Sequence, residues 1–143
     1  MIDRNPWLLV GGCLSLTAAA IHLACIVGGP DWYLFLGAGE GMVQAAERGD
    51  WRAPAITLLI AATLAMAGLY ALSGAGVIAR LPLLKAGLLV ITAAFLLRGA
   101  VLFRPSMLGR SDLSPTFLIA SSSIVLAIGV IHAIGIWRGW NRL

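Results

Sequence analysis

Four long apolar runs alternate with short polar stretches along the chain. They cover residues 7–27, 54–73, 83–103 and 116–137. Each has about the 20 apolar residues that an α-helix needs to cross the hydrocarbon core of a bilayer. The pattern predicts an all-α fold: an integral membrane four-helix bundle that runs up-down-up-down through the membrane.

The first connection, residues 28–53, is the only one long enough to hold structure of its own. It contains an aromatic segment at 32–36 and a second segment at 42–48 with one apolar side. Asp31 is expected to cap the first segment, Gly37 to end it, and Asp50 to cap the helix that enters the second span. We therefore predict a short interfacial helical cap across one mouth of the bundle.

Composition agrees with a membrane protein and limits its partners. Of 143 residues, 60% are hydrophobic and 11% charged, and the mean hydropathy is +0.96. Soluble domains have about a quarter of their residues charged. Residues 1–143 are expected to form a single transmembrane domain. The net charge of +4 is spread over several loops. Without a basic stripe, no nucleic acid is expected as a partner.

The charges in the loops favour one orientation. With both termini in the cytoplasm, five basic residues lie inside: Arg4, Arg80, Lys85, Arg138 and Arg142. Four lie outside: Arg48, Arg52, Arg104 and Arg110. Basic residues prefer the cytoplasmic side. The expectation is a multi-pass protein of the bacterial inner membrane, N-in and C-in. A cleavable signal sequence ending near Ala20 is the alternative, but the apolar run continues to Val27, which is too long for one.

Small or polar residues recur at helical spacing in every span. Helices in a membrane pack through such stripes because small side chains let the backbones approach. The stripes are Gly11, Ser15, Ala18, His22, Cys25 and Gly29 in the first span; Thr57, Ala61, Ala65 and Gly68 in the second; Gly87, Ile91, Ala94 and Arg98 in the third; and Ser122, Val125, Gly129 and His132 in the fourth.

His22, Arg98 and His132 are the ionisable residues on these stripes, and such residues are costly inside a membrane unless they meet a partner. At about 1.5 Å per residue, His22 lies about 22 Å above the side where the chain starts, and His132 about 8 Å above it. A shared haem or metal is therefore not expected, and no cofactor is predicted. Arg98 lies about 20 Å above the same side, level with His22.

At this height in the membrane, the positively charged Arg98 is expected to pair with a carboxylate. Glu40 is the first candidate in the cap loop, followed by Asp31 and Glu47. The glycines around Glu40 do not have dinucleotide-binding spacing. We predict one polar ligand-binding cluster, with no catalytic residue and no metal ligand in it. Its members are His22, Trp32, Tyr33, Glu40 and Arg98.

Three short motifs resemble a family of small, uncharacterised four-helix bacterial membrane proteins. They are His22 with Gly28-Gly29 and Trp32, the run Phe95-Leu96-Leu97-Arg98, and Ser114-Pro115. The resemblance implies the four-helix membrane fold and a role for His22 and Arg98. It implies no activity.

Three classes of function remain open from the sequence. The first is a non-enzymatic membrane protein that binds a lipid-like ligand or a partner membrane protein through the polar cluster. The second is a membrane-embedded enzyme in which His22 and Glu40 exchange protons on a lipid substrate. The third is a small transporter that works as a homo-oligomer, since four helices rarely enclose a pathway alone.

Overall fold

The computed structural model describes residues 4–103 and 115–143, and these are helical with no strand among them. Four helices are long and apolar enough to cross a membrane: α1 (Pro6–Gly28), α4 (Arg52–Gly74), α5 (Leu84–Ala100) extended by the 3₁₀ turn η1 (Val101–Phe103), and α6 (Pro115–Gly139). The predicted fold class is confirmed, and the chain is a multi-pass membrane protein. Arg104, Arg110 and Ser114, used in the sequence arguments, lie outside the described residues.

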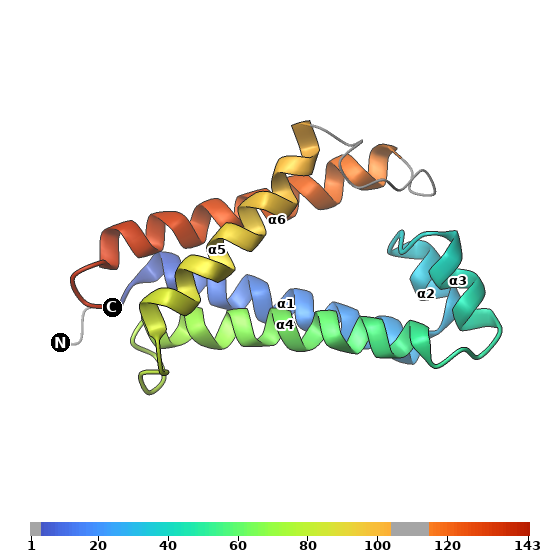
Figure 1. Cartoon of the computed structure of the whole chain (residues 1–143), viewed down its shortest axis with the longest axis horizontal. Coiled ribbons are helices and arrows are strands. Elements are labelled where there is room, and N and C mark those ends of the chain that lie inside the picture. The colour runs from blue at the N-terminus through green and yellow to red at the C-terminus, as the bar shows by residue number, and fades with distance from the viewer. Residues whose placement is uncertain (1–3, 104–114) are drawn as a thin grey trace.

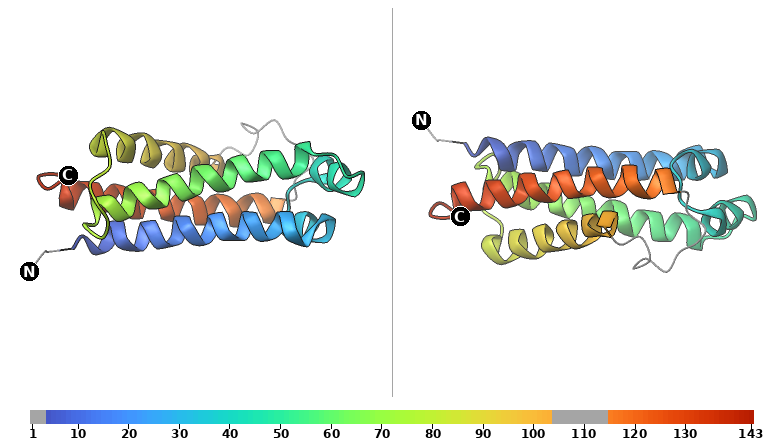
Figure 2. Two further views of the ribbon diagram at one scale, coloured as in Figure 1. Left: turned by 90° about the horizontal axis from the view of Figure 1, so that it is seen from below. Right: turned by 90° about the horizontal axis from the view of Figure 1, so that it is seen from above.

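The long helices form two antiparallel pairs (Figure 1). α1 packs along α4, α5 packs along α6, and α6 also packs against α1. Both termini and the connection between α4 and α5 lie at one end, which we call the termini end (Figures 1 and 2). The short helices α2 (Pro30–Phe35) and α3 (Glu40–Glu47) lie at the other, the cap end. The predicted helical cap is thus present, with its helices starting two residues earlier.

Local chemistry sets the helix ends. Asn5 caps α1 because its side-chain oxygen accepts from the backbone N–H groups of Trp7 and Leu8. Asp50 bonds to the start of α4, since its carboxylate accepts from the Arg52 N–H at 3.0 Å, but the cap position that was predicted for it is taken by Trp51. The prediction for Asp31 was wrong. Pro30 starts α2, so Gly29, with φ of 72°, takes the cap position and Asp31 falls inside the first turn.

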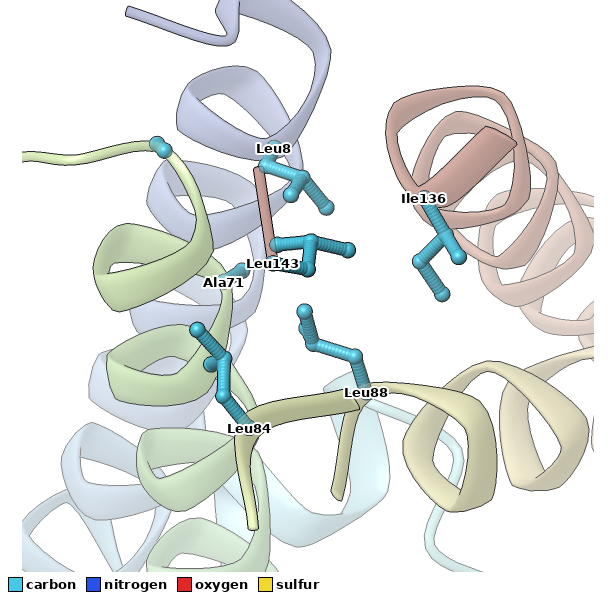
Figure 3. Packing of buried hydrophobic residues seen from close by; sticks show 7 residues of the cluster. Leu8, Ala71, Leu84, Leu88, Ile136 and Leu143 are labelled. Carbon is cyan, nitrogen blue, oxygen red and sulfur yellow. The ribbon is translucent and has the colours of Figure 1, made fainter. Parts of the chain in front are cut away.

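An apolar layer closes the bundle at the termini end. It joins side chains from all four long helices and from the chain's last residue (Figure 3). Its members are Leu8, Ala71, Ala75, Leu84, Leu88, Ile136 and Leu143. Leu8 and Leu88 are fully buried. This layer fixes the positions of α1, α4, α5 and α6 relative to one another at this end.

The cap has its own small core. Tyr33 of α2 is buried against Cys25 of α1 and Ala53 of α4. Met42, Val43 and Ala46 of α3 pack against it, as the one-sided apolar pattern of residues 42–48 predicted. The cap also reaches α6, because a β-carbon added at Gly37 would lie 2.3 Å from the Phe117 ring. The cap therefore bridges the two helix pairs.

Three of the four predicted small-residue stripes face other helices. Gly11, Ser15 and Cys25 of α1 are buried, as are Thr57, Ala61 and Gly68 of α4 and Ser122, Gly129 and His132 of α6. The stripe predicted for the third span was wrong. Ala94 is exposed, and the buried face of α5 consists of Leu84, Leu88, Thr92, Phe95 and Gly99. The larger apolar side chains of α5 fill the bundle interior. The helix is therefore rotated about its axis relative to the prediction, and Arg98 is half-buried at the edge of the α5–α6 contact.

The closest approach between α5 and α6 depends on Gly99. A β-carbon at this position would lie 2.6 Å from the Leu126 Cα and 2.8 Å from its backbone nitrogen. Backbone atoms cannot rotate away as a side chain can. Any side chain at position 99 therefore forces the two helices apart.

Gly99→Ala is expected to destabilise the protein by about 1 to 3 kcal/mol, the usual cost of overpacking a filled interior. The matched control is Gly41→Ala on α3, where an added β-carbon meets nothing within 4 Å. Reversible unfolding in mixed detergent micelles measures both. Equal stability of the two variants would show that α5 and α6 do not pack this closely.

Candidate functional site

Arg98 of α5 forms hydrogen bonds to α6 near the cap end. Its Nη1 donates to Ser122 Oγ at 3.0 Å, and its Nη2 to Ser121 Oγ at a longer 3.4 Å. Ser122 is fully buried, whereas the guanidinium is half-buried. The contact exists because neighbouring Gly99 brings α5 against α6. Arg98 thus holds its position through neutral hydroxyl groups on the adjacent span.

His22 is half-buried on α1 and bonds to its own helix. Its Nδ1 lies 2.8 Å from the Ala18 carbonyl oxygen. A carbonyl only accepts, so Nδ1 carries the proton and donates, which leaves Nε2 as the free acceptor of the neutral ring. The imidazole is therefore oriented by the backbone one turn before it.

The packing of α1 on α6 gives the relative height of these residues. Leu8 lies against Gly135, and Gly11 lies against His132. Each step along α1 towards the cap thus matches one step back along α6, which puts His22 level with Ser121. His22 and Arg98 consequently share a height. His132 faces Gly11, about 16 Å nearer the termini end at 1.5 Å per residue.

Trp32 and Tyr33 lie on α2 and point in different directions. The Trp32 ring covers Gly28, where an added β-carbon would lie 2.1 Å from it, and the side chain is 45% exposed. Tyr33 is 2% exposed, and its buried hydroxyl has no hydrogen-bond partner among the residues that the structure describes. Trp32 thus offers surface at the cap end, while Tyr33 belongs to the core of the cap.

Glu40 opens α3 and is exposed. Across the part of the chain that the structure describes, no hydrogen bond or ion pair joins it to Arg98. Of the five residues in the predicted cluster, the structure brings His22 and Arg98 to one height and puts Trp32, Tyr33 and Glu40 in the cap. That these five residues bind a ligand together stays a prediction.

The sequence reasoning missed the partners of Arg98. Ser121, Ser122 and Ser123 form a polar run inside an apolar span, and this run was the available signal. Helical spacing placed Ser122 on the predicted stripe of the fourth span, but it could not show that this serine meets Arg98. Only the crossing of α5 and α6 brings the Ser122 hydroxyl to the guanidinium.

The termini end differs in chemistry from the cap end. It has a cavity of about 250 Å³ whose lining includes Asn5, Ser73, Arg80 and Arg142. Two cation–π contacts lie at the same end, with Lys85 Nζ 4.8 Å from the centre of the Trp140 ring and the Arg138 guanidinium 5.8 Å from that of Trp7. Such aromatic and basic pairs are typical of the membrane–water interface.

Comparison with protein-family models, with curated proteins and with solved structures found no match for this chain. Within residues 4–103 and 115–143, no three His, Cys, Asp or Glu side chains gather as metal ligands would. Functional arguments therefore rest on the chemistry of the helices themselves.

Ser122→Ala is expected to lower the free energy of unfolding by about 1.5 to 3 kcal/mol, because it removes a hydrogen bond to a charged group. The control is Ser123→Ala, the next residue along α6, whose exposed side chain is expected to change stability by less than about 0.5 kcal/mol. Unfolding in mixed micelles compares them. Similar values for both variants would contradict the role given to Ser122.

Proposed function

We propose that this protein binds an anionic, lipid-like ligand at the cap end of its membrane spans, with Arg98 holding the anionic group. The observation that carries the proposal is the pairing of Arg98 with serine hydroxyls alone among the described residues. A hydroxyl accepts a hydrogen bond but supplies no negative charge. An intramembrane arginine without a counter-ion is costly, so an anion is favoured beside it.

The surroundings of Arg98 suit a ligand that arrives from the bilayer. Leu97 is 73% exposed and Phe103 is 74% exposed on either side of it along the chain. These apolar side chains are in position to contact an acyl chain while the guanidinium bonds a phosphate or carboxylate. Guanidinium groups bind both anions with two parallel hydrogen bonds.

The other cluster residues have supporting roles in this proposal. His22 shares the height of Arg98 and keeps its Nε2 free to accept from a hydroxyl of the ligand. Trp32 contributes an interfacial ring, and Tyr33 holds α2 in place from within the cap core. Glu40 is exposed, so in this proposal it lies where a ligand would enter and does not contact the bound anion.

The test uses lipid bound to protein purified in nanodiscs of mixed phosphatidylglycerol and phosphatidylcholine. Arg98→Gln is expected to reduce the preference for phosphatidylglycerol about tenfold or more, the effect of losing roughly 1.4 kcal/mol or more of binding free energy. Arg98→Lys should keep part of it, because a lysine retains the charge but not the bidentate geometry. Native mass spectrometry counts the lipids retained.

Arg48→Gln is the matched control, since Arg48 is an exposed arginine at the same end. An unchanged lipid preference in folded Arg98→Gln would refute the proposal. Loss of a co-purifying membrane protein, with lipid binding intact, would instead indicate that a partner's carboxylate meets Arg98.

We also propose an N-in, C-in orientation in a bacterial inner membrane. Five basic side chains mark the termini end: Arg4, Arg80, Lys85, Arg138 and Arg142. None of the described acidic residues lies there, because Asp31, Glu40, Glu47 and Asp50 are all in the cap region. Asp112, also counted at the cap end in the sequence, is outside the described residues. An excess of lysine and arginine favours the cytoplasmic side.

Single cysteines introduced into a Cys13→Ala, Cys25→Ala background test this orientation. Glu47→Cys at the cap end should react in spheroplasts with a membrane-impermeant maleimide, whereas Ala79→Cys at the termini end should react only after lysis. Both positions are exposed, so differences in burial do not enter. The reverse labelling pattern would show that the cap faces the cytoplasm.

A further inference from the structure

Two neighbouring hollows lie at the termini end, around the connection between α4 and α5 (Figures 1 and 2). The narrower hollow, already described, has a volume of about 250 Å³ and is lined by Arg142. The wider one has about 530 Å³ and is lined by Lys85. Arg80 and Leu84 line both. Arg80 is therefore shared by two spaces, each of which has a second basic side chain of its own.

The charge of these hollows is positive. Among the residues that the structure describes, none that lines either hollow is acidic. Arg80 donates to the backbone oxygen of Leu143, and a guanidinium has five N–H donors in all. Even with one negative charge counted at Leu143, the three cations Arg80, Lys85 and Arg142 leave an excess of positive charge. Basic pockets at the cytoplasmic ends of membrane spans are typical binding places for anionic lipid headgroups.

The backbone that carries Arg80 is held on both sides. Ser73 Oγ donates to the Ala79 carbonyl oxygen at 3.0 Å and accepts from the Leu81 N–H at 2.9 Å. One hydroxyl near the end of α4 thus fixes the residues immediately before and after Arg80. Because this backbone is ordered before any ligand arrives, binding costs less conformational entropy.

The far end of the same connection is also fixed, and it exposes apolar side chains. The Tyr70 hydroxyl donates to the Pro82 carbonyl oxygen at 3.1 Å. Leu83 has φ of 52°, a conformation that a non-glycine residue keeps only where its surroundings hold it. Leu83 lines the wider hollow and is 81% exposed, and Ile78 lines the narrower one and is also exposed. Each hollow therefore has an apolar side chain beside its basic ones.

The narrower hollow is closed towards the bundle interior. Ala75 and Leu84 line it and also belong to the apolar layer of Figure 3. Asn5 lines it as well, and its Nδ2 donates to the Gly135 carbonyl oxygen at 2.7 Å, which joins the start of α1 to α6. A group bound here consequently stays at the surface of the bundle, at the level of the lipid headgroups.

We propose that the two hollows bind the headgroup of an anionic lipid that carries two phosphate groups, one in each hollow, with Arg80 between them. Arg142 faces the first phosphate and Lys85 the second. Guanidinium groups bind phosphate with paired hydrogen bonds, and lysine adds a point charge. A headgroup with one phosphate fills one hollow and leaves the basic side chain of the other without an anion. This site is at the opposite end from Arg98 and does not rest on the proposed function.

The first test counts lipids retained in nanodiscs by native mass spectrometry. The parent protein carries Arg98→Gln so that the cap end does not contribute, and the unmodified protein is compared in parallel. Cardiolipin supplies two phosphate groups per headgroup, and phosphatidylglycerol at equal total phosphate supplies one. The parent is expected to retain cardiolipin in preference. Arg80→Gln should lower that retention about fivefold or more, the factor expected from the loss of one basic group beside anionic lipid.

Arg138→Gln is the matched control. Arg138 is an exposed arginine at the same end, and it lines neither hollow. The substitution removes the same charge from the same end, so cardiolipin retention is expected to stay close to that of the parent. Equal losses in Arg80→Gln and Arg138→Gln would show only a general attraction of basic side chains to an anionic surface, and would overturn the proposal.

Lys85→Gln tests the requirement for two phosphate groups. It removes the basic side chain of the wider hollow alone, so the preference for cardiolipin over phosphatidylglycerol should disappear while phosphatidylglycerol retention changes little. Thermal unfolding establishes that each variant is folded, and Lys85→Gln gives an independent result if Arg80→Gln does not fold. A preference for cardiolipin that survives in folded Lys85→Gln, or is missing from the folded parent, overturns the proposal.

Inorganic pyrophosphate distinguishes a lipid from a soluble diphosphate. It carries two phosphate groups without acyl chains, so it lacks the contacts with Ile78 and Leu83. Calorimetric titration into nanodiscs of phosphatidylcholine alone is expected to show no saturable binding at concentrations where cardiolipin is retained. Saturable binding that Arg80→Gln abolishes, without cardiolipin retention, would assign the hollows to a soluble diphosphate and overturn the lipid assignment.

Discussion

Close approach of helix backbones at glycine positions holds the spans together, because lipid gives apolar helices no hydrophobic reason to associate. A β-carbon at Gly12 would lie 3.1 Å from the Gly68 carbonyl oxygen, and one at Gly135 would lie 3.1 Å from the Leu8 nitrogen. Gly99 allows the closest contact, against the backbone of Leu126. These contacts determine which side chains of one helix can meet those of the next.

Arg98 of α5 and His132 of α6 lie in different surroundings because of this packing. Arg98 lies next to the Gly99 contact and extends to two hydroxyls of α6, remaining half-buried. His132 is fully buried against Gly11 and beside Phe95, with one nitrogen bonded to its own helix. The guanidinium thus stays partly exposed, while the imidazole is enclosed.

The two ends of the bundle differ for a related reason. At the termini end, leucine and isoleucine side chains from several helices fill the interior. Towards the cap end, the α5–α6 pair diverges from α1 and α4 (Figure 1), and Phe117 packing on Gly37 connects α6 to the cap. The bundle is therefore closed by a continuous apolar layer at one end and by the packing of the cap at the other.

The sequence by itself determined the number of spans, their approximate ends, the helical cap and the height of His22 and Arg98, because span length and helical rise are local properties of the chain. It also pointed to the buried stripes of α1, α4 and α6, where small residues recur regularly. It did not determine the rotation of α5 or the placement of Asp31. It also could not choose Ser122 over Glu40 as the hydrogen-bond partner of Arg98. Those outcomes depend on how helices distant in sequence cross, and only the tertiary structure decides where two backbones come close enough for their side chains to meet.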